Sequence, residues 1–168
     1  GNVAAKEHVD SIPEGVKKIA SKAFYRKNVI EVNFPDSLIE IGEEAFGYSN
    51  LIQVAMPLSV TTFGANIFIG TPWLRNQDDS LVFNNVFLLY IGNALEYQIP
   101  NGIEKIASKA FSETTLSRVV IPESVTYISD EAFDSKINEI VFLGSLPDFL
   151  NSFVAEDVIL RVNLNQTI

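Results

Sequence analysis

The stretch "GVKKIASKAF", residues 15–24, recurs as "GIEKIASKAF", residues 102–111, with eight of the ten positions identical. Two residue types extend this repetition along the chain. A proline that follows an apolar residue recurs at intervals of 22, 22, 43 and 22 residues, as Pro13, Pro35, Pro57, Pro100 and Pro122. A phenylalanine keeps the same intervals, as Phe24, Phe46, Phe68, Phe111 and Phe133. The chain therefore contains five copies, in phase, of a 22-residue unit.

A 22-residue unit is too small to bury its own apolar face, so its copies must stack into one core. The stretch "LSRVVI", residues 116–121, is rich in β-branched residues and ends at a proline, which predicts a short strand. The stretch "SDEAFDS", residues 129–135, predicts a helical turn with Ser129 as its N-cap and two acidic residues in its first turn. Equivalent strands should pair in parallel, and the repeated phenylalanines should stack as an internal ladder. The predicted fold is an α/β solenoid with short parallel strands and short helical turns.

The 43-residue interval indicates an insertion of 21 residues within residues 71–92. Inside it, "LVFNNVFLL", residues 81–89, predicts a β-hairpin that turns at Asn84-Asn85, because asparagine tolerates the positive φ of tight hairpin turns. The predicted solenoid therefore carries one inserted hairpin.

Insertions in solenoids often map to one face, which can bind partners. One interpretation of this insertion is that Trp73, Phe87 and Tyr90 form a contact platform. The alternative is that Trp73 and Phe83 are core residues that fill the gap between the two stacks.

The outward positions of the predicted strands are a second candidate binding surface, because solenoid faces commonly bind partners. Side chains alternate along a strand, so the L, V and I of each L-x-x-V-x-I segment point inward. The candidate contact residues on the outward positions are Ile30, Ile52, Leu95, Gln53, Glu96 and Arg118. The three apolar residues among them form a strip with two interpretations. Either the hairpin or another chain covers it, or it is scattered surface apolar side chains.

Composition argues against several classes of function. The net charge of −9 repels a phosphate backbone, so we expect no nucleic acid partner. No apolar run reaches the ~20 residues of a membrane-spanning helix. One histidine, His8, and no cysteine make a Ser-His-Asp triad or a thiolate zinc site implausible. We expect no catalytic residue, no cofactor and no metal site, with a carboxylate-based glycosidase as a remote alternative.

The shared pattern P-x-S-V-x-x-I-x-x-x-A-F-x-x-x-x-L-x-x-V-x-I-P resembles the BspA-like leucine-rich repeats, which are found on bacterial cell surfaces and in some protozoa. The resemblance covers about residues 12–147, and "GTPWL", residues 70–74, resembles a recurrent interruption in that family. The stretches "VFLGSLP", residues 141–147, and "VILRV", residues 158–162, resemble the end of its array. The resemblance implies a right-handed, curved, leucine-rich-repeat-like solenoid used for adhesion or protein contact. That family shares no catalytic motif, so the resemblance assigns no functional residue.

These observations predict an N-terminal segment, residues 1–11, a solenoid, residues 12–147, and a closing segment, residues 148–168. The expected function is an exported, extracellular or cell-surface interaction module that binds a protein, such as a host matrix or cell-surface protein. The alternative is a structural spacer or display stalk within a larger surface protein. Residue 1 is a glycine, which we expect from a processed or trimmed start.

Overall fold

A computed structural model of the chain describes residues 9–133, 136–145 and 158–162. The chain divides into two compact units, residues 1–77 and residues 78–168. His8 and most of the predicted closing segment lie outside the described residues. The predicted bounds of the three segments stay predictions.

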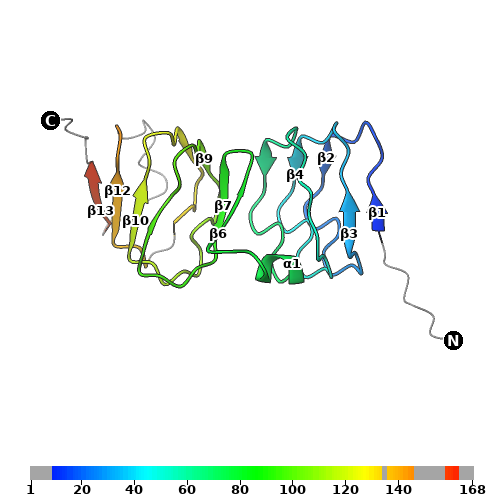
Figure 1. The fold of residues 1–168 in the computed structure, drawn as a ribbon, viewed down its shortest axis with the longest axis horizontal. Coiled ribbons are helices and arrows are strands. Elements are labelled where there is room, and N and C mark those ends of the chain that lie inside the picture. Colours follow the sequence, from blue (N-terminus) through cyan, green and yellow to red (C-terminus); the bar gives the residue numbers. More distant parts are fainter. Residues whose placement is uncertain (1–8, 134–135, 146–157, 163–168) are drawn as a thin grey trace. The chain divides into compact units, whose positions relative to one another are not determined.

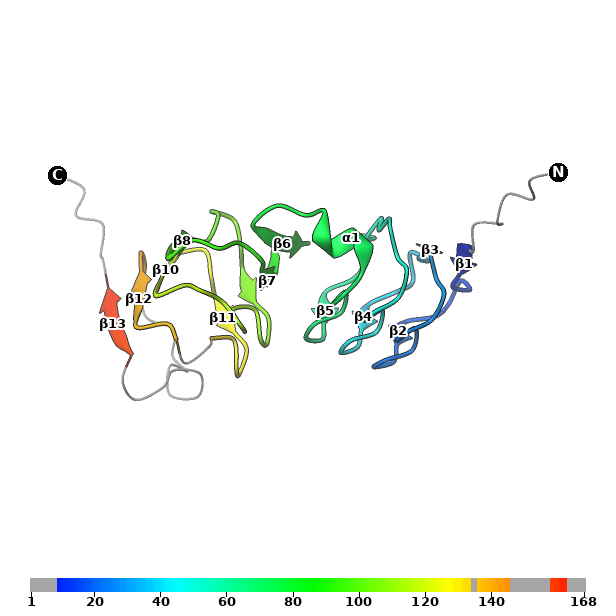
Figure 2. The same cartoon turned by 90° about the horizontal axis from the view of Figure 1, so that it is seen from below.

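The N-terminal unit is a short stack of coils with two parallel sheets, which lie on opposite sides of the coils (Figure 2). One sheet pairs β1 with β3, and a single bridge continues it from Glu31 to Gln53. The other has the order β2-β4-β5. The strands are β1 (Val9–Ser11), β2 (Lys18–Ile19), β3 (Glu31–Asn33), β4 (Glu40–Ile41) and β5 (Thr62–Phe63). Paired residues such as Lys18 and Glu40 are 22 positions apart, so one repeat of the sequence is one coil.

The C-terminal unit also has two sheets, in the orders β8-β10-β12-β13 and β6-β7-β9-β11 (Figure 1 and Figure 2). Every strand pair in them is parallel except β6–β7. The strands are β6 (Ser80–Phe83), β7 (Val86–Tyr90), β8 (Glu96–Gln98), β9 (Lys105–Ile106), β10 (Arg118–Ile121), β11 (Tyr127–Ile128), β12 (Glu139–Phe142) and β13 (Ile159–Val162). The predicted solenoid with short parallel strands is therefore confirmed in each unit, but it is a β-solenoid and the predicted α/β class is not confirmed.

The predicted helical turns are not confirmed, because residues at the corners of the coils adopt the left-handed region, which an α-helix does not contain. In place of a helix, the corners contain non-glycine residues with φ from 50° at Glu44 to 60° at Lys22. Glu131, expected in a helical first turn after Ser129, has φ 57°. Among the described residues the helix is confined to α1 (Pro72–Arg75), which lies in the insertion.

Hydrogen bonds between coils explain why these corners are not helical. The backbone N–H groups of Lys22, Phe24 and Arg26 donate to carbonyl oxygens of the next coil at 2.9, 2.7 and 2.9 Å. The intervening N–H groups of Ala23 and Tyr25 donate within the turn, three residues back. An α-helix would direct these donors to the i−4 carbonyl instead. Stacking of coils therefore determines the conformation of the corner.

The repeated phenylalanines form the predicted ladder within each unit. Phe46 stacks between Phe24 and Phe68, with ring centroids 4.9 and 5.8 Å away. In the C-terminal unit, Phe111 and Phe133 stack with centroids 5.3 Å apart and rings 5° from parallel. Phe46, Phe68 and Phe111 are at most 1% exposed, so each ladder is part of the core of its unit.

The insertion contains the predicted hairpin, and its second strand belongs to the solenoid. Asn84 and Asn85 have φ of 49° and 63°, as a type I′ turn requires, so this prediction is confirmed. β7 also pairs in parallel with β9, placing Phe87 beside Ile106. The hairpin thus supplies the strand that a regular coil would have contributed at this place.

Candidate functional site

Each unit has a candidate functional surface, which is the outward side of the sheet that contains β3 in the N-terminal unit and β8 in the C-terminal unit. Each of these surfaces is called here the strand face of its unit. The outward columns are in the predicted register within each unit. Glu31 pairs with Gln53, and Arg118 lies between Glu96 and Glu139 on neighbouring strands. The column that sequence alternation predicted is therefore confirmed, which gives the face a defined order of side chains.

The two apolar residues Ile52 and Leu95 are 56% and 67% exposed on the strand faces of their units. Ile30, one repeat before Ile52 in the N-terminal unit, is half-buried. The hairpin does not cover Leu95, because β6 and β7 belong to the other sheet of the same unit. Gln53 and Glu96 are exposed and Arg118 is half-buried, so all of these side chains reach the surface. Their contact with a partner stays a prediction.

The contact platform expected from the insertion is wrong for two of its three residues. Phe87 is 0% exposed and stacks on Phe111 with centroids 5.0 Å apart, so it is a further rung of the ladder. Tyr90 is 3% exposed, and its hydroxyl accepts a hydrogen bond from the backbone N–H of Ala94. Both face the core because β7 is a strand of the solenoid and not a projecting arm.

Trp73 is half-buried and packs on the N-terminal ladder. Its ring lies edge-on to Phe68, with centroids 4.9 Å apart. Thr71 fixes this placement, because its hydroxyl caps α1 by accepting from the N–H of Leu74 and donates to the carbonyl of Phe68. The backbone N–H of Trp73 also donates to the carbonyl of Leu51. This packing agrees with a core role for Trp73. Phe83 is half-buried in the hairpin.

On the C-terminal unit, the charged side chains of the strand face neutralise one another. Arg118 contacts Glu96 at 3.2 Å and Glu139 at 2.9 Å, and Glu139 also pairs with Arg161 of β13. Four charges on four neighbouring strands thus form an alternating chain of ion pairs. This part of the face carries no excess charge that a partner would need to match.

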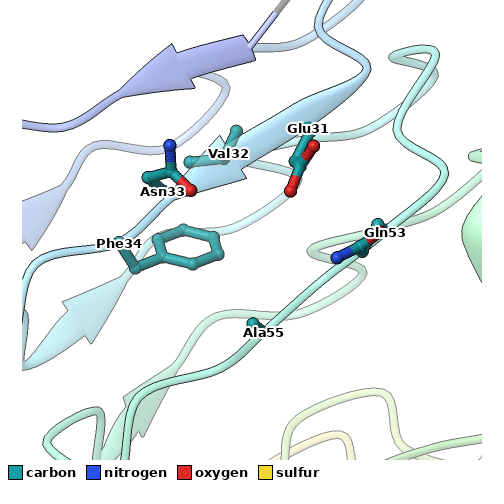
Figure 3. A pocket seen from close by; sticks show the side chains of 6 residues that line it. All are labelled: Glu31, Val32, Asn33, Phe34, Gln53 and Ala55. Carbon is teal, nitrogen blue, oxygen red and sulfur yellow. The ribbon is translucent and has the colours of Figure 1, made fainter.

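On the N-terminal unit, the strand face contains a pocket of about 140 Å³ between β3 and the next coil (Figure 3). It is lined by Glu31, Val32, Asn33, Phe34, Gln53 and Ala55. The pocket exists because, in the sheet that contains β3, the next coil forms only the bridge between Glu31 and Gln53, and because the side chain of Ala55 is only a methyl group. Drug-sized ligand pockets begin at about 300 Å³, so this one fits a side chain.

A cluster at the corner of the N-terminal unit was missed by sequence reasoning. The guanidinium of Arg26 lies 5.4 Å from the ring centre of Tyr25 and 5.7 Å from that of Tyr48, which is 50% exposed. Gly47 and Gly70 make room, because a Cβ there would lie 2.9 and 2.5 Å from the two tyrosine rings. The signal was the "YRK" at residues 25–27, which the other copies lack.

The described residues contain no group of three His, Cys, Asp or Glu side chains placed to hold a metal ion. Within the same residues, no helix has the length and apolar character needed to cross a membrane. Among the described residues, the strand faces of the two units therefore offer exposed aliphatic groups, ion pairs and, in the N-terminal unit, a polar pocket.

A family model for the BspA type leucine rich repeat region matches residues 8–80 and 90–168 in six copies. The chain belongs to the BspA-type leucine-rich repeat family. The matches leave out residues 81–89, which correspond to the hairpin stretch. The family model adds one copy to the five that proline and phenylalanine spacing indicated. No curated protein matches the chain.

Among solved structures, the chain is similar to a leucine rich cell surface protein from Faecalibacterium prausnitzii, with 28% identity and a TM-score of 0.44. That match covers 79% of this chain and 41% of the other. The pneumococcal vaccine antigen PcpA is 16% identical with a TM-score of 0.43, and 93% of this chain and 56% of that one are covered. A leucine-rich repeat protein from Bacteroides ovatus is 17% identical with a TM-score of 0.38, covering 92% and 56%. The chain thus spans about half the length of these proteins or less.

Proposed function

We propose that this chain is the protein-binding part of an exported cell-surface protein and that the strand face makes the contact. The observation that carries this proposal is the exposure of Ile52 and Leu95, which directly precede the bridge residue Gln53 and strand β8. Aliphatic side chains held in water on a defined surface gain free energy when a partner covers them, at roughly 25 cal/mol per Å² of apolar area. Membership in the family supports binding in preference to catalysis.

The structural-spacer alternative differs in what the surface must do. A spacer needs only the stacked core and the closed corners, so substitutions on the strand face would leave its function intact. The exposed apolar residues would then be ordinary surface side chains, which are common on soluble proteins.

Charge substitutions distinguish the two roles. Adherence to immobilised matrix proteins and cultured host cells should fall at least tenfold in Ile52→Glu and Leu95→Glu, while the melting temperatures stay within ~2 °C of wild type. Leu58→Glu is the matched control, because Leu58 is 87% exposed but follows Pro57 in a turn outside the strand face. Equal adherence of all four proteins to every surface would refute the binding role. Loss of adherence in Leu58→Glu as well would refute its assignment to the strand face.

A further inference from the structure

We propose that the pocket between β3 and the following coil binds an arginine side chain of the protein partner. This inference rests on the proposed function, since it names the chemistry that one part of the strand face takes. It begins from Glu31, whose side chain is half-buried at the rim of the pocket. None of the ion pairs within the described residues involves Glu31.

In the C-terminal unit, the carboxylates in the equivalent outward column form ion pairs with an arginine of a neighbouring strand. Glu96 and Arg118 are register partners on neighbouring strands and form an ion pair of 3.2 Å. Glu31 and Gln53 are register partners in the same way, but the N-terminal unit has glutamine where the C-terminal unit has arginine. Glu31 therefore lacks the guanidinium that Glu96 receives from its own chain.

The remaining groups around the pocket suit a guanidinium in particular. The side-chain amide nitrogen of Asn33 donates to the hydroxyl of Ser11 at 3.3 Å. The oxygen of the same amide group remains available as a hydrogen-bond acceptor. Figure 3 shows this oxygen and the carboxylate of Glu31 at the rim of the space between the coils, with the ring of Phe34 beside it. A guanidinium has several donors in one plane and can also stack on an aromatic ring.

Packing against the core fixes the position of the Phe34 ring at the pocket. The ring meets Phe46 edge-on, with centroids 5.7 Å apart, while part of it lines the pocket. The pocket volume of about 140 Å³ admits one long side chain, and the chain's net charge of −9 attracts a basic one. The carboxylate and the amide oxygen together favour arginine over a neutral or acidic side chain, because both accept hydrogen bonds from a guanidinium.

The test is an amide NMR titration of the whole chain with Nα-acetyl-arginine amide. Its uncharged isostere, Nα-acetyl-citrulline amide, is the ligand control. Arginine should shift the amides of Glu31, Asn33 and Gln53 in a saturable way, with a dissociation constant on the order of 10 mM, because a single exposed ion pair is weak. Citrulline should bind at least fivefold more weakly. Equal shifts from both ligands would overturn the proposal.

Three variants locate the binding. Glu31→Gln should weaken the arginine response at least fivefold, whereas Glu14→Gln, which removes an exposed turn carboxylate, should leave it unchanged. Gln53→Arg should also abolish the response, because the new side chain would pair with Glu31 as Arg118 pairs with Glu96. An arginine response that survives in both Glu31→Gln and Gln53→Arg would refute the site. Because no partner is needed, failure here is distinguishable from failure of the adherence test on Ile52 and Leu95.

Discussion

Truncation of Phe46 to alanine should destabilise the protein more than truncation of any phenylalanine at the end of a ladder. Phe46 is fully buried, stacks on two rings and meets Phe34 edge-on at 5.7 Å. Removing a buried phenylalanine side chain costs roughly 3–5 kcal/mol from lost transfer free energy and the cavity left behind. For a chain of this length, that loss corresponds to a fall of about 6–20 °C in melting temperature.

Phe24→Ala is the matched control, because Phe24 has the same place in the repeat. It is only half-buried, and the stacking partner described for it is Phe46 alone. We expect it to cost about half as much as Phe46→Ala, since less apolar area is lost and the site is open to water.

The assay is urea unfolding followed by tryptophan fluorescence. Trp73 is the only tryptophan of the chain and packs on Phe68 in the same ladder, so its emission reports on the N-terminal unit. The slope of free energy against urea should be unchanged between the proteins, which would show that the loss is one of stability. If Phe46→Ala costs less than about 1 kcal/mol, or no more than Phe24→Ala, the ladder is not part of the core.

Two further predictions concern the C-terminal unit. Asn85→Val should destabilise the chain by about 1–2 kcal/mol, because a β-branched residue is strained at φ 63°, whereas Asn85→Gly should be neutral or slightly stabilising in urea unfolding; equal costs would contradict the turn assignment. Glu139→Gln breaks its ion pairs with Arg118 and Arg161 and should cost no more than about 1 kcal/mol at low salt. In 1 M NaCl, where the screening length is about 3 Å, the difference from wild type should disappear, and a loss that is independent of salt would contradict an electrostatic role.

The repeat period made most of the fold predictable. A spacing of 22 residues between prolines and phenylalanines gave the length of a coil, and strand alternation gave the column of Glu31 and Gln53. Asn84-Asn85 between two apolar stretches predicted the hairpin turn. These features depend on local pattern or on strict repetition, so a single sequence contains them.

The corners and the hairpin's second strand depend on contacts between coils, which local pattern does not contain. The Ser-Asp-Glu of residues 129–131 resembles a helix start, yet the neighbouring coil takes the backbone hydrogen bonds that a helix needs. Phe87 looked exposed because it follows a hairpin turn, whereas β7 pairs with β9 and buries it. The pocket was missed for the same reason, since it forms where pairing between two coils stops after Gln53.

The chain contains no cysteine, so single-cysteine variants allow the binding face to be mapped directly. A bulky maleimide label at Ile52→Cys or Leu95→Cys lies on the strand face, and a label at Leu58→Cys or Tyr127→Cys lies off it, at positions that are also exposed. The measurement is adherence of each labelled protein relative to its unlabelled form. We predict at least a tenfold loss for the two labels on the strand face and less than a twofold change for the other two. The opposite ranking, or equal adherence of all four, would contradict the claim that this protein acts through its strand face.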